Sequence, residues 1–175
     1  MGCKRPLTSQ SGLVPTIIAS RAEKCECFAI ISIMKLFVGV KALIEKEGKV
    51  LLIREAKYDE GLNEGKWDVP GGRIEVEETL MEGLSREVFE ETGLKVMSTR
   101  ILDVHETFRE KVGEKWHIVR VYYRTEVEGE IVLSKDHDAY EWVNPADYGG
   151  KILMTDVAGL LDSGLTPISH IKSVW

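Results

Sequence analysis

The feature that most constrains the fold is the stretch of residues 71–94, GGRIEVEETLMEGLSREVFEETGL, which holds seven glutamates and two arginines. Leu80, Leu84 and Val88 recur every four residues, a spacing that places them on one face of an α-helix. Gly93 follows at the position where a left-handed residue commonly ends a helix. The stretch therefore predicts an amphipathic helix with its apolar face on a core and its glutamates outside.

Three of these glutamates, Glu87, Glu90 and Glu91, lie at positions i, i+3 and i+4, so their carboxylates share one helix face. Each pair of like charges at this spacing destabilises an isolated helix by about 0.2–0.5 kcal/mol. A divalent cation would offset the repulsion, and carboxylate oxygens suit Mg²⁺ or Mn²⁺. Arg86 can orient one carboxylate, and Gly83 leaves room for a group to approach the helix. The alternative interpretation is a solvated acidic face.

The segments around this helix have the composition of β-strands. Before the helix, residues 36–45 and 50–55 surround the turn KEGK and predict a hairpin. A short strand that Pro70 and the glycine pair break is expected in residues 67–72, and further strands in residues 94–108, 115–127 and 140–143. A helical turn is expected at Pro145, and a final helix over residues 155–164 that Gly164 closes. The order of strands, helix, strands, helix predicts an α+β or α/β sandwich with mixed β-sheets.

Charge and hydropathy exclude some classes of protein. The net charge of -6 argues against broad nucleic-acid or anionic-membrane binding, because both need a basic surface. Lys35 and Lys41 interrupt the longest apolar run, residues 28–44, so no transmembrane helix is expected. Neither a membrane nor a nucleic acid is therefore the expected partner, and self-association into a homodimer is left open.

The chain is expected to comprise one globular domain over residues 34–164, with an N-terminal extension (1–33) and a C-terminal tail (165–175). The extension could lie upstream of the true start, since Met34 opens the first well-patterned segment; a signal peptide is the weaker alternative. All three cysteines lie in the first 27 residues. We therefore expect reduced thiols in a cytoplasmic protein, with zinc at the C-x-C pair of Cys25 and Cys27 as the less favoured reading.

A longer pattern is superimposed on the acidic helix. Residues 72–94 fit G-x5-E-x7-R-E-U-x-E-E-x-G-U, in which U is a bulky apolar residue, and all the specified positions match. This pattern resembles the signature of the Nudix hydrolase family, of the MutT type. The resemblance implies an α/β/α sandwich and Mg²⁺- or Mn²⁺-dependent hydrolysis of a nucleoside diphosphate linked to another moiety.

The resemblance also implies a role for each residue of the catalytic set. Glu90 and Glu91 correspond to the principal pair of metal ligands, and Glu87 corresponds to a further ligand or to the general base. Arg86 would orient Glu87, and the backbone carbonyl of Gly71 matches a metal ligand in some family members. The choice of general base among the glutamates stays open.

Other positions are matched by the family at the margins of the motif. Gly72, Glu78 and Gly93 would serve the conformation of the motif itself. Asp136 is the closest match to an additional metal-binding carboxylate that some members supply after the motif, and a solvated acid is the alternative. Arg54 resembles a residue that contacts phosphate in some members, although a surface arginine fits equally well.

The substrate is the least determined feature. Patterns that resemble those of ADP-ribose, dinucleoside polyphosphate and coenzyme A hydrolases are missing, which leaves a nucleoside triphosphate or modified nucleotide as the expected substrate. Hydrolases of ADP-ribose, nucleotide sugars or dinucleoside polyphosphates, and a non-catalytic domain that senses nucleotides, remain as alternatives. The four histidines have no catalytic partner that the sequence reveals, and we expect structural or exposed positions for them.

Overall fold

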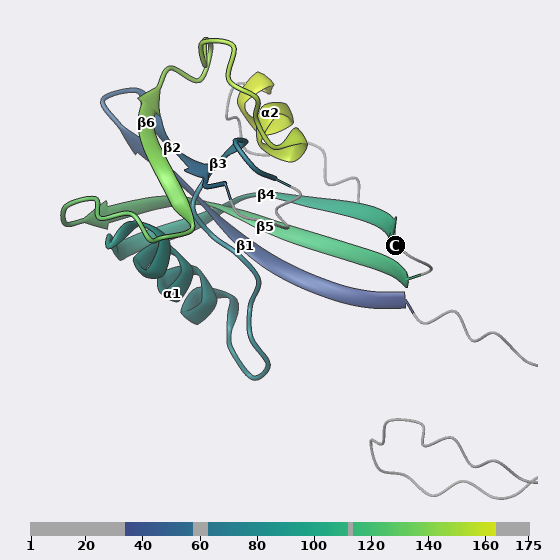
Figure 1. Ribbon diagram of the computed structural model, residues 1–175. Coiled ribbons are helices and arrows are strands. Elements are labelled where there is room, and N and C mark those ends of the chain that lie inside the picture. The colour runs from purple at the N-terminus through teal and green to yellow at the C-terminus, as the bar shows by residue number, and fades with distance from the viewer. Residues whose placement is uncertain (1–33, 58–62, 112–113, 164–175) are drawn as a thin grey trace, which may run out of the picture. The chain divides into compact units, whose positions relative to one another are not determined.

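The computed structural model describes residues 34–57, 63–111 and 114–163, all within one compact unit, Ser32–Trp175. The predicted extension 1–33, the tail 165–175 and the helix-closing Gly164 lie outside the described residues and stay predictions. Figure 1 shows the strands of a mixed β-sheet with helices on different sides of it. The elements are β1 (Met34–Lys46), β2 (Lys49–Glu55), β3 (Trp67–Asp68), α1 (Leu80–Thr92), β4 (Lys95–Lys111), β5 (Glu114–Glu128), β6 (His137–Val143) and α2 (Thr155–Asp162).

Two antiparallel hairpins supply most of the sheet. β1 and β2 pair across the turn at Glu47 and Gly48, which confirms the predicted hairpin, and β4 pairs with β5 along nearly its whole length. β1 then runs parallel to β5, with pairs from Met34–Lys115 to Ile44–Thr125. The strand order is β3-β2-β1-β5-β4, and β6 also pairs with β2. β1 is thus the strand that joins both hairpins.

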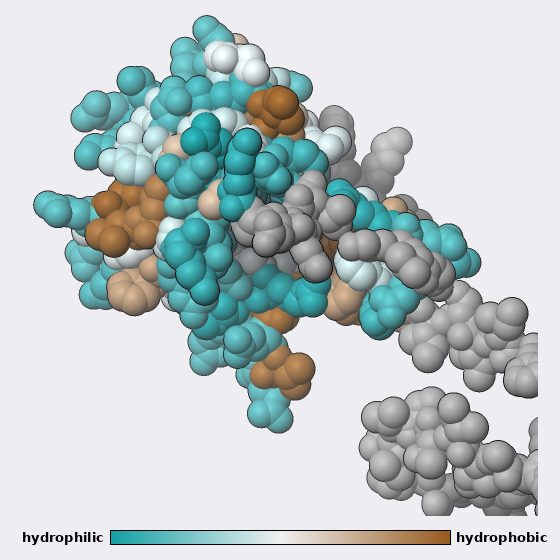
Figure 2. Space-filling model, viewed as in Figure 1, coloured by the Kyte–Doolittle hydropathy of each residue, from teal (hydrophilic) through white to brown (hydrophobic). Residues whose placement is uncertain are grey.

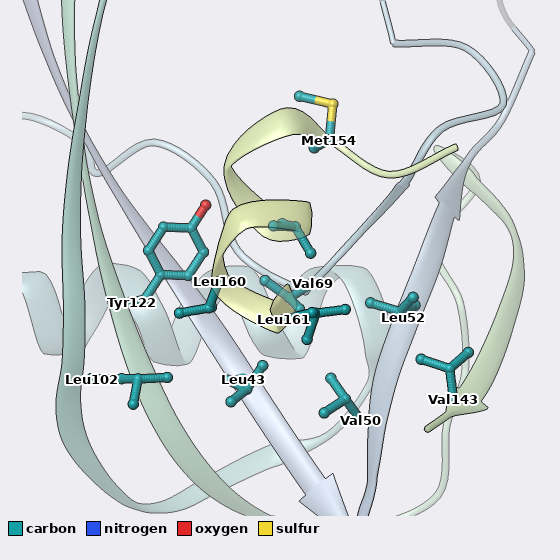
Figure 3. Packing of buried hydrophobic residues seen from close by; sticks show 11 residues of the cluster. Leu43, Val50, Leu52, Val69, Leu102, Tyr122, Val143, Met154, Leu160 and Leu161 are labelled. Atoms are coloured by element: carbon teal, nitrogen blue, oxygen red, sulfur yellow. The ribbon is translucent and has the colours of Figure 1, made fainter. Parts of the chain in front are cut away.

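Alternate residues of β1 and β2 feed two hydrophobic cores. Leu43, Val50 and Leu52 pack in the core beneath α2, together with Leu160. Figure 3 shows these side chains gathered between α2 and the strands. On the other face, neighbouring strand residues such as Ala42, Ile44 and Leu51 pack with Leu84 and Val88 of α1. The two helical layers therefore cover opposite faces of the strands, which confirms the expected sandwich.

Helix α1 has well-defined ends. The side chain of Thr79 accepts a hydrogen bond from the Glu82 amide, and the Glu82 carboxylate accepts one from the Thr79 amide in return. This capping box satisfies two amides that a helix leaves unpaired at its start. At the other end Gly93 adopts a left-handed φ of 70°, as the sequence predicts.

One detail departs from the sequence-based expectation. Pro145 opens no helix; the chain makes a tight turn there, closed by a bridge between Asn144 and Asp147.

Among the described residues, no helix is both long and apolar enough to cross a bilayer. Figure 2 shows mostly hydrophilic side chains on the viewed face, with hydrophobic residues in separate patches.

Candidate active site

The loop that enters α1 lies against the backbone of β1. The amide of Ala42 donates to the Pro70 carbonyl at 2.7 Å, and the amide of Val40 donates to the Gly72 carbonyl at 2.9 Å. Gly71 between them has a φ of 127°, and a Cβ there would lie 2.2 Å from the Val40 carbonyl oxygen. Only glycine fits this conformation and this approach, so residue 71 brings its peptide group close to the strand.

Glu91, in the last turn of α1, contacts the backbone of Gly71. The Gly71 amide donates a hydrogen bond to Glu91 Oε2 at 2.7 Å. Only 19% of the Glu91 side chain is exposed. Burial raises the pKa of Glu91 to about 7, although the charge of Lys41 and the Gly71 hydrogen bond oppose the shift. The Glu91 side chain is therefore mostly buried, and the pKa of its carboxyl group lies near neutral pH.

A buried ion pair holds the other side of the loop. Lys41 Nζ lies 2.7 Å from Asp68 Oδ2, with 12% and 10% of the two side chains exposed. The same ammonium donates to the carbonyls of Val69, at 3.3 Å, and of Gly71. Burial by itself would lower the pKa of Lys41, but the charges of Asp68 and Glu91 outweigh it and raise the pKa. Lys41 is therefore charged and bound to the loop.

Arg86 connects the glutamates on the outer side of α1. Its guanidinium donates two hydrogen bonds of 2.8 Å to Glu78 and one of 2.9 Å to Glu87, and it approaches Glu90 at 3.2 Å. It also reaches the carbonyl of Arg73 at 3.1 Å. Arg86 therefore holds the Glu87 carboxylate by a hydrogen bond and offsets the repulsion among the carboxylates.

The three glutamates of the helix face differ in environment. Glu87 is largely buried, with 15% of its side chain exposed, whereas 58% of the Glu90 side chain is exposed. Glu87 lies against the loop, because a Cβ on Gly72 would come 2.4 Å from Glu87 Oε2. Gly72 thus provides space beside a carboxylate, and the left-handed conformation in this glycine pair belongs to Gly71 instead.

Glu78 and Gly83 fix the start of the helix. The hydrogen bonds from Arg86 lower the pKa of Glu78 to about 2, with help from the Glu75 amide. A Cβ on Gly83 would lie 2.8 Å from Ile74 and 3.0 Å from Glu78. The group that approaches this glycine is therefore the preceding loop.

Arg54 and Asp136, which are proposed at the margins of the motif, contact residues other than the glutamates of α1. Arg54 forms an ion pair with Asp138 at 2.6 Å, and the exposed Asp136 accepts a hydrogen bond from the Ala56 amide through its backbone carbonyl. The assignment of Arg54 to phosphate and of Asp136 to metal stays a prediction.

His137, next to Asp136 in the sequence, is buried, and its Nε2 lies 3.9 Å from Glu91 Oε1. Burial, together with the charge of Lys41, lowers the pKa of His137, which favours the neutral imidazole.

The donor set fits a hard divalent cation. Glu87, Glu90 and Glu91 come from one helix face; Glu87 and Glu91 also lie against the loop of Gly71, whose carbonyl already binds the ammonium of Lys41. Carboxylate and carbonyl oxygens are the ligands that Mg²⁺ and Mn²⁺ prefer. Across residues 34–57, 63–111 and 114–163, no three acidic, histidine or cysteine side chains are already grouped around a common point. Glu87 and Glu90 are bound to Arg86 instead.

Beside the loop lies a hollow of about 180 Å³, bounded among others by Phe37, Gly72, Arg73 and Arg120. The guanidinium of Arg73 stacks on the Phe37 ring, with 3.8 Å from Cζ to the ring centroid. Arg120 also borders a second hollow of about 420 Å³ and forms an ion pair with Asp156 at 3.0 Å. Cationic and aromatic side chains therefore line a hollow that reaches Gly72, the residue beside Glu87.

Comparison with known proteins agrees with this geometry. Residues 35–159 match the model of the NUDIX domain, a segment that contains the loop, α1 and every described residue of the site. The chain therefore belongs to the Nudix family and is a MutT-like Nudix hydrolase.

Curated relatives cover different parts of the chain. A MutT-like protein of Streptomyces ambofaciens is 28% identical over 75% of this chain and 78% of its own length. The CTP pyrophosphohydrolase of Escherichia coli is 30% identical over 65% of this chain and 80% of its own. The human 8-oxo-dGDP phosphatase NUDT18 is 36% identical over 59% of this chain, but the match spans only 29% of that longer protein.

Solved structures show the same fold. The MutT NUDIX hydrolase of Burkholderia pseudomallei superimposes with a TM-score of 0.61 at 25% identity, over 73% of this chain and 97% of that one. The MutT protein of Methanosarcina mazei gives a TM-score of 0.56 at 31% identity, over 74% and 94% of the two chains.

Sequence reasoning missed three residues that contact the site: Lys41, Asp68 and His137. Lys41 is visible in the sequence as a single charge within an apolar strand, but hydropathy alone treats it only as an interruption. A lone lysine between buried strand residues predicts a buried partner, since an unpaired buried charge is costly. Asp68 and His137 give no comparable signal, because their neighbours in the sequence do not reveal burial.

Proposed function

We propose that this hydrolase cleaves a pyrophosphate bond in a nucleoside diphosphate linked to another moiety, with Mg²⁺ or Mn²⁺ as cofactor. A nucleoside triphosphate or modified nucleotide is the first candidate substrate. The names of the CTP pyrophosphohydrolase and the 8-oxo-dGDP phosphatase among its relatives support this substrate class.

The observation that carries the proposal is the backbone of Gly71, which contacts residues of both α1 and β1. Its amide binds Glu91, and its carbonyl points to the only cation that contacts it in the described structure, Lys41. A metal held here would take Glu91, Glu90 and the Gly71 carbonyl as ligands, with Glu87 as a further ligand or as the general base. When bound, a divalent cation neutralises charge on the phosphate oxygens during hydrolysis.

The protein's own groups supply the remaining chemistry. A water attacks phosphorus, the bond from phosphorus to the bridging oxygen breaks, and a carboxylate accepts the proton of the water. Arg86 holds Glu87 for this task at 2.9 Å. Arg73, which lines the hollow beside Gly72, is placed to attract a phosphate group.

The test is a product screen with Mg²⁺. The panel comprises the common nucleoside triphosphates, 8-oxo-dGTP, 8-oxo-dGDP, nucleotide sugars, ADP-ribose and dinucleoside polyphosphates. We expect one clearly preferred substrate, and its products identify the phosphorus that is attacked. An enzyme that binds Mn²⁺ and yet turns over nothing in the panel would contradict the catalytic proposal and favour a nucleotide sensor.

A further inference from the structure

The pair of Lys41 and Asp68 stands out among the ion pairs of the described residues because both side chains are nearly buried. Lys41 lies in β1 between residues that belong to the two cores, and Val40, Ala42 and Leu43 are fully buried. A buried ion pair adds little stability compared with packed apolar side chains, since desolvation offsets the attraction. Stability alone is therefore a weak reason for this pair.

The contacts of Lys41 point to the loop. An ammonium has three N–H donors, and Lys41 Nζ has three oxygen partners: Asp68 Oδ2 and the carbonyls of Val69 and Gly71. Asp68 is fixed in turn, because its Oδ1 accepts the Val69 amide at 2.8 Å. The ion pair therefore closes a network around residues 68–71.

Gly71 is held through both of its backbone polar groups. Its amide donates to Glu91 Oε2, and its carbonyl accepts from Lys41. A carbonyl oxygen has two lone pairs, so the Lys41 contact leaves one of them for another cation. The orientation of the carbonyl is thus set from the β1 side.

We propose that Lys41, with Asp68, is a positioning pair that orients the Gly71 carbonyl for the divalent cation. The inference rests on the proposed metal site and adds to it a support that lies outside the glutamate motif. Groups that orient metal ligands commonly affect metal affinity by about 10–100-fold when they are replaced.

The experiment removes the pair without changing net charge. Lys41→Met or Asp68→Asn alone would alter the field at the metal and confuse electrostatics with positioning, so the test uses the double variant Lys41→Met/Asp68→Asn. The side-chain amide that Asp68→Asn introduces keeps a carbonyl oxygen for the Val69 amide. The control is Lys35→Met/Glu114→Gln, which removes an ion pair of 2.7 Å between the same strand and β5 whose side chains are 47% exposed.

Two readouts are taken on full-length protein: the Mn²⁺ affinity, from the electron paramagnetic resonance signal of free Mn²⁺, and the Gly71 amide resonance without metal. Glu91→Gln identifies the Mn²⁺ bound at this site. Melting curves of all variants give a temperature at which every variant is folded. Binding is measured at or below that temperature.

We expect Mn²⁺ affinity to fall by about 10–100-fold in the double variant, with a shifted Gly71 amide, while the control matches wild type. A double variant that melts earlier but binds Mn²⁺ as tightly as the control would overturn the inference and leave the proposed function intact. If wild type binds no Mn²⁺ that Glu91→Gln removes, the inference and the proposed metal site fail together.

Discussion

At the scale of single residues, one glycine organises the site. Gly71 lies 20 residues before Glu91 in sequence, yet its amide binds that carboxylate and its carbonyl binds Lys41. Burial of the Glu91 carboxylate and close packing of Gly71 against β1 are both costs that the fold accepts. Each cost leads to a measurable prediction.

The first prediction concerns pH. Without metal, the folded protein holds the Glu91 proton up to a pKa of about 7, against an ordinary value of 4.5. Between these values the folded state binds more protons than the unfolded state, so stability falls as pH rises. In EDTA, the melting temperature of Glu91→Gln minus that of wild type should therefore increase as the pH is raised from about 5 to about 8. Parallel melting profiles for the two proteins would refute a raised pKa.

The second prediction compares two glycines with left-handed φ. Gly48→Ala meets no atom within 4 Å, whereas a Cβ at Gly71 would lie 2.2 Å from the Val40 oxygen. We expect Gly48→Ala to cost about 1–2 kcal/mol in the free energy of unfolding, which is the penalty for this backbone conformation. Gly71→Ala should cost clearly more, as measured by urea denaturation. Equal costs would show that the loop does not pack closely on β1.

At the scale of elements, α1 shows how much local sequence can predict. The spacing of Leu80, Leu84 and Val88 and the position of Gly93 predict the helix and its end, because these signals act within a few residues. The motif likewise identifies the glutamates. It does not show that Arg86 would bind Glu78, Glu87 and Glu90 together, since the resemblance assigned it only to Glu87.

The third prediction tests the packed face of α1. Leu84 is fully buried in the core on this side, whereas 39% of the neighbouring Met81 is exposed. Leu84→Ala should lower the free energy of unfolding by about 2–5 kcal/mol, because it leaves a cavity. Met81→Ala serves as the matched control and should have a much smaller effect in the same urea titration. Similar losses for both variants would mean that the helix face is assigned wrongly.

At the scale of the whole molecule, the parallel pairing of β1 with β5 lies beyond what the sequence reveals. The paired residues Met34 and Lys115 are far apart along the chain, and the apolar patterns of both strands fit several partners. That pairing fixes β1, and β1 carries both the loop contacts of Val40 and Ala42 and the ammonium of Lys41. The sequence therefore predicts the chemical groups of the site. The fold determines that β1 is the strand that supports them.

The most direct test of the account is the hydrolysis rate of Glu91→Gln with Mg²⁺ on the preferred substrate. Glu75→Gln is the control, because Glu75 is an exposed glutamate of the same acidic stretch. We predict that Glu91→Gln loses about two or more orders of magnitude in kcat, with no loss of folded structure by circular dichroism, while the control keeps its rate. Full turnover by Glu91→Gln would contradict the assignment of this glutamate, and with it the proposed metal site.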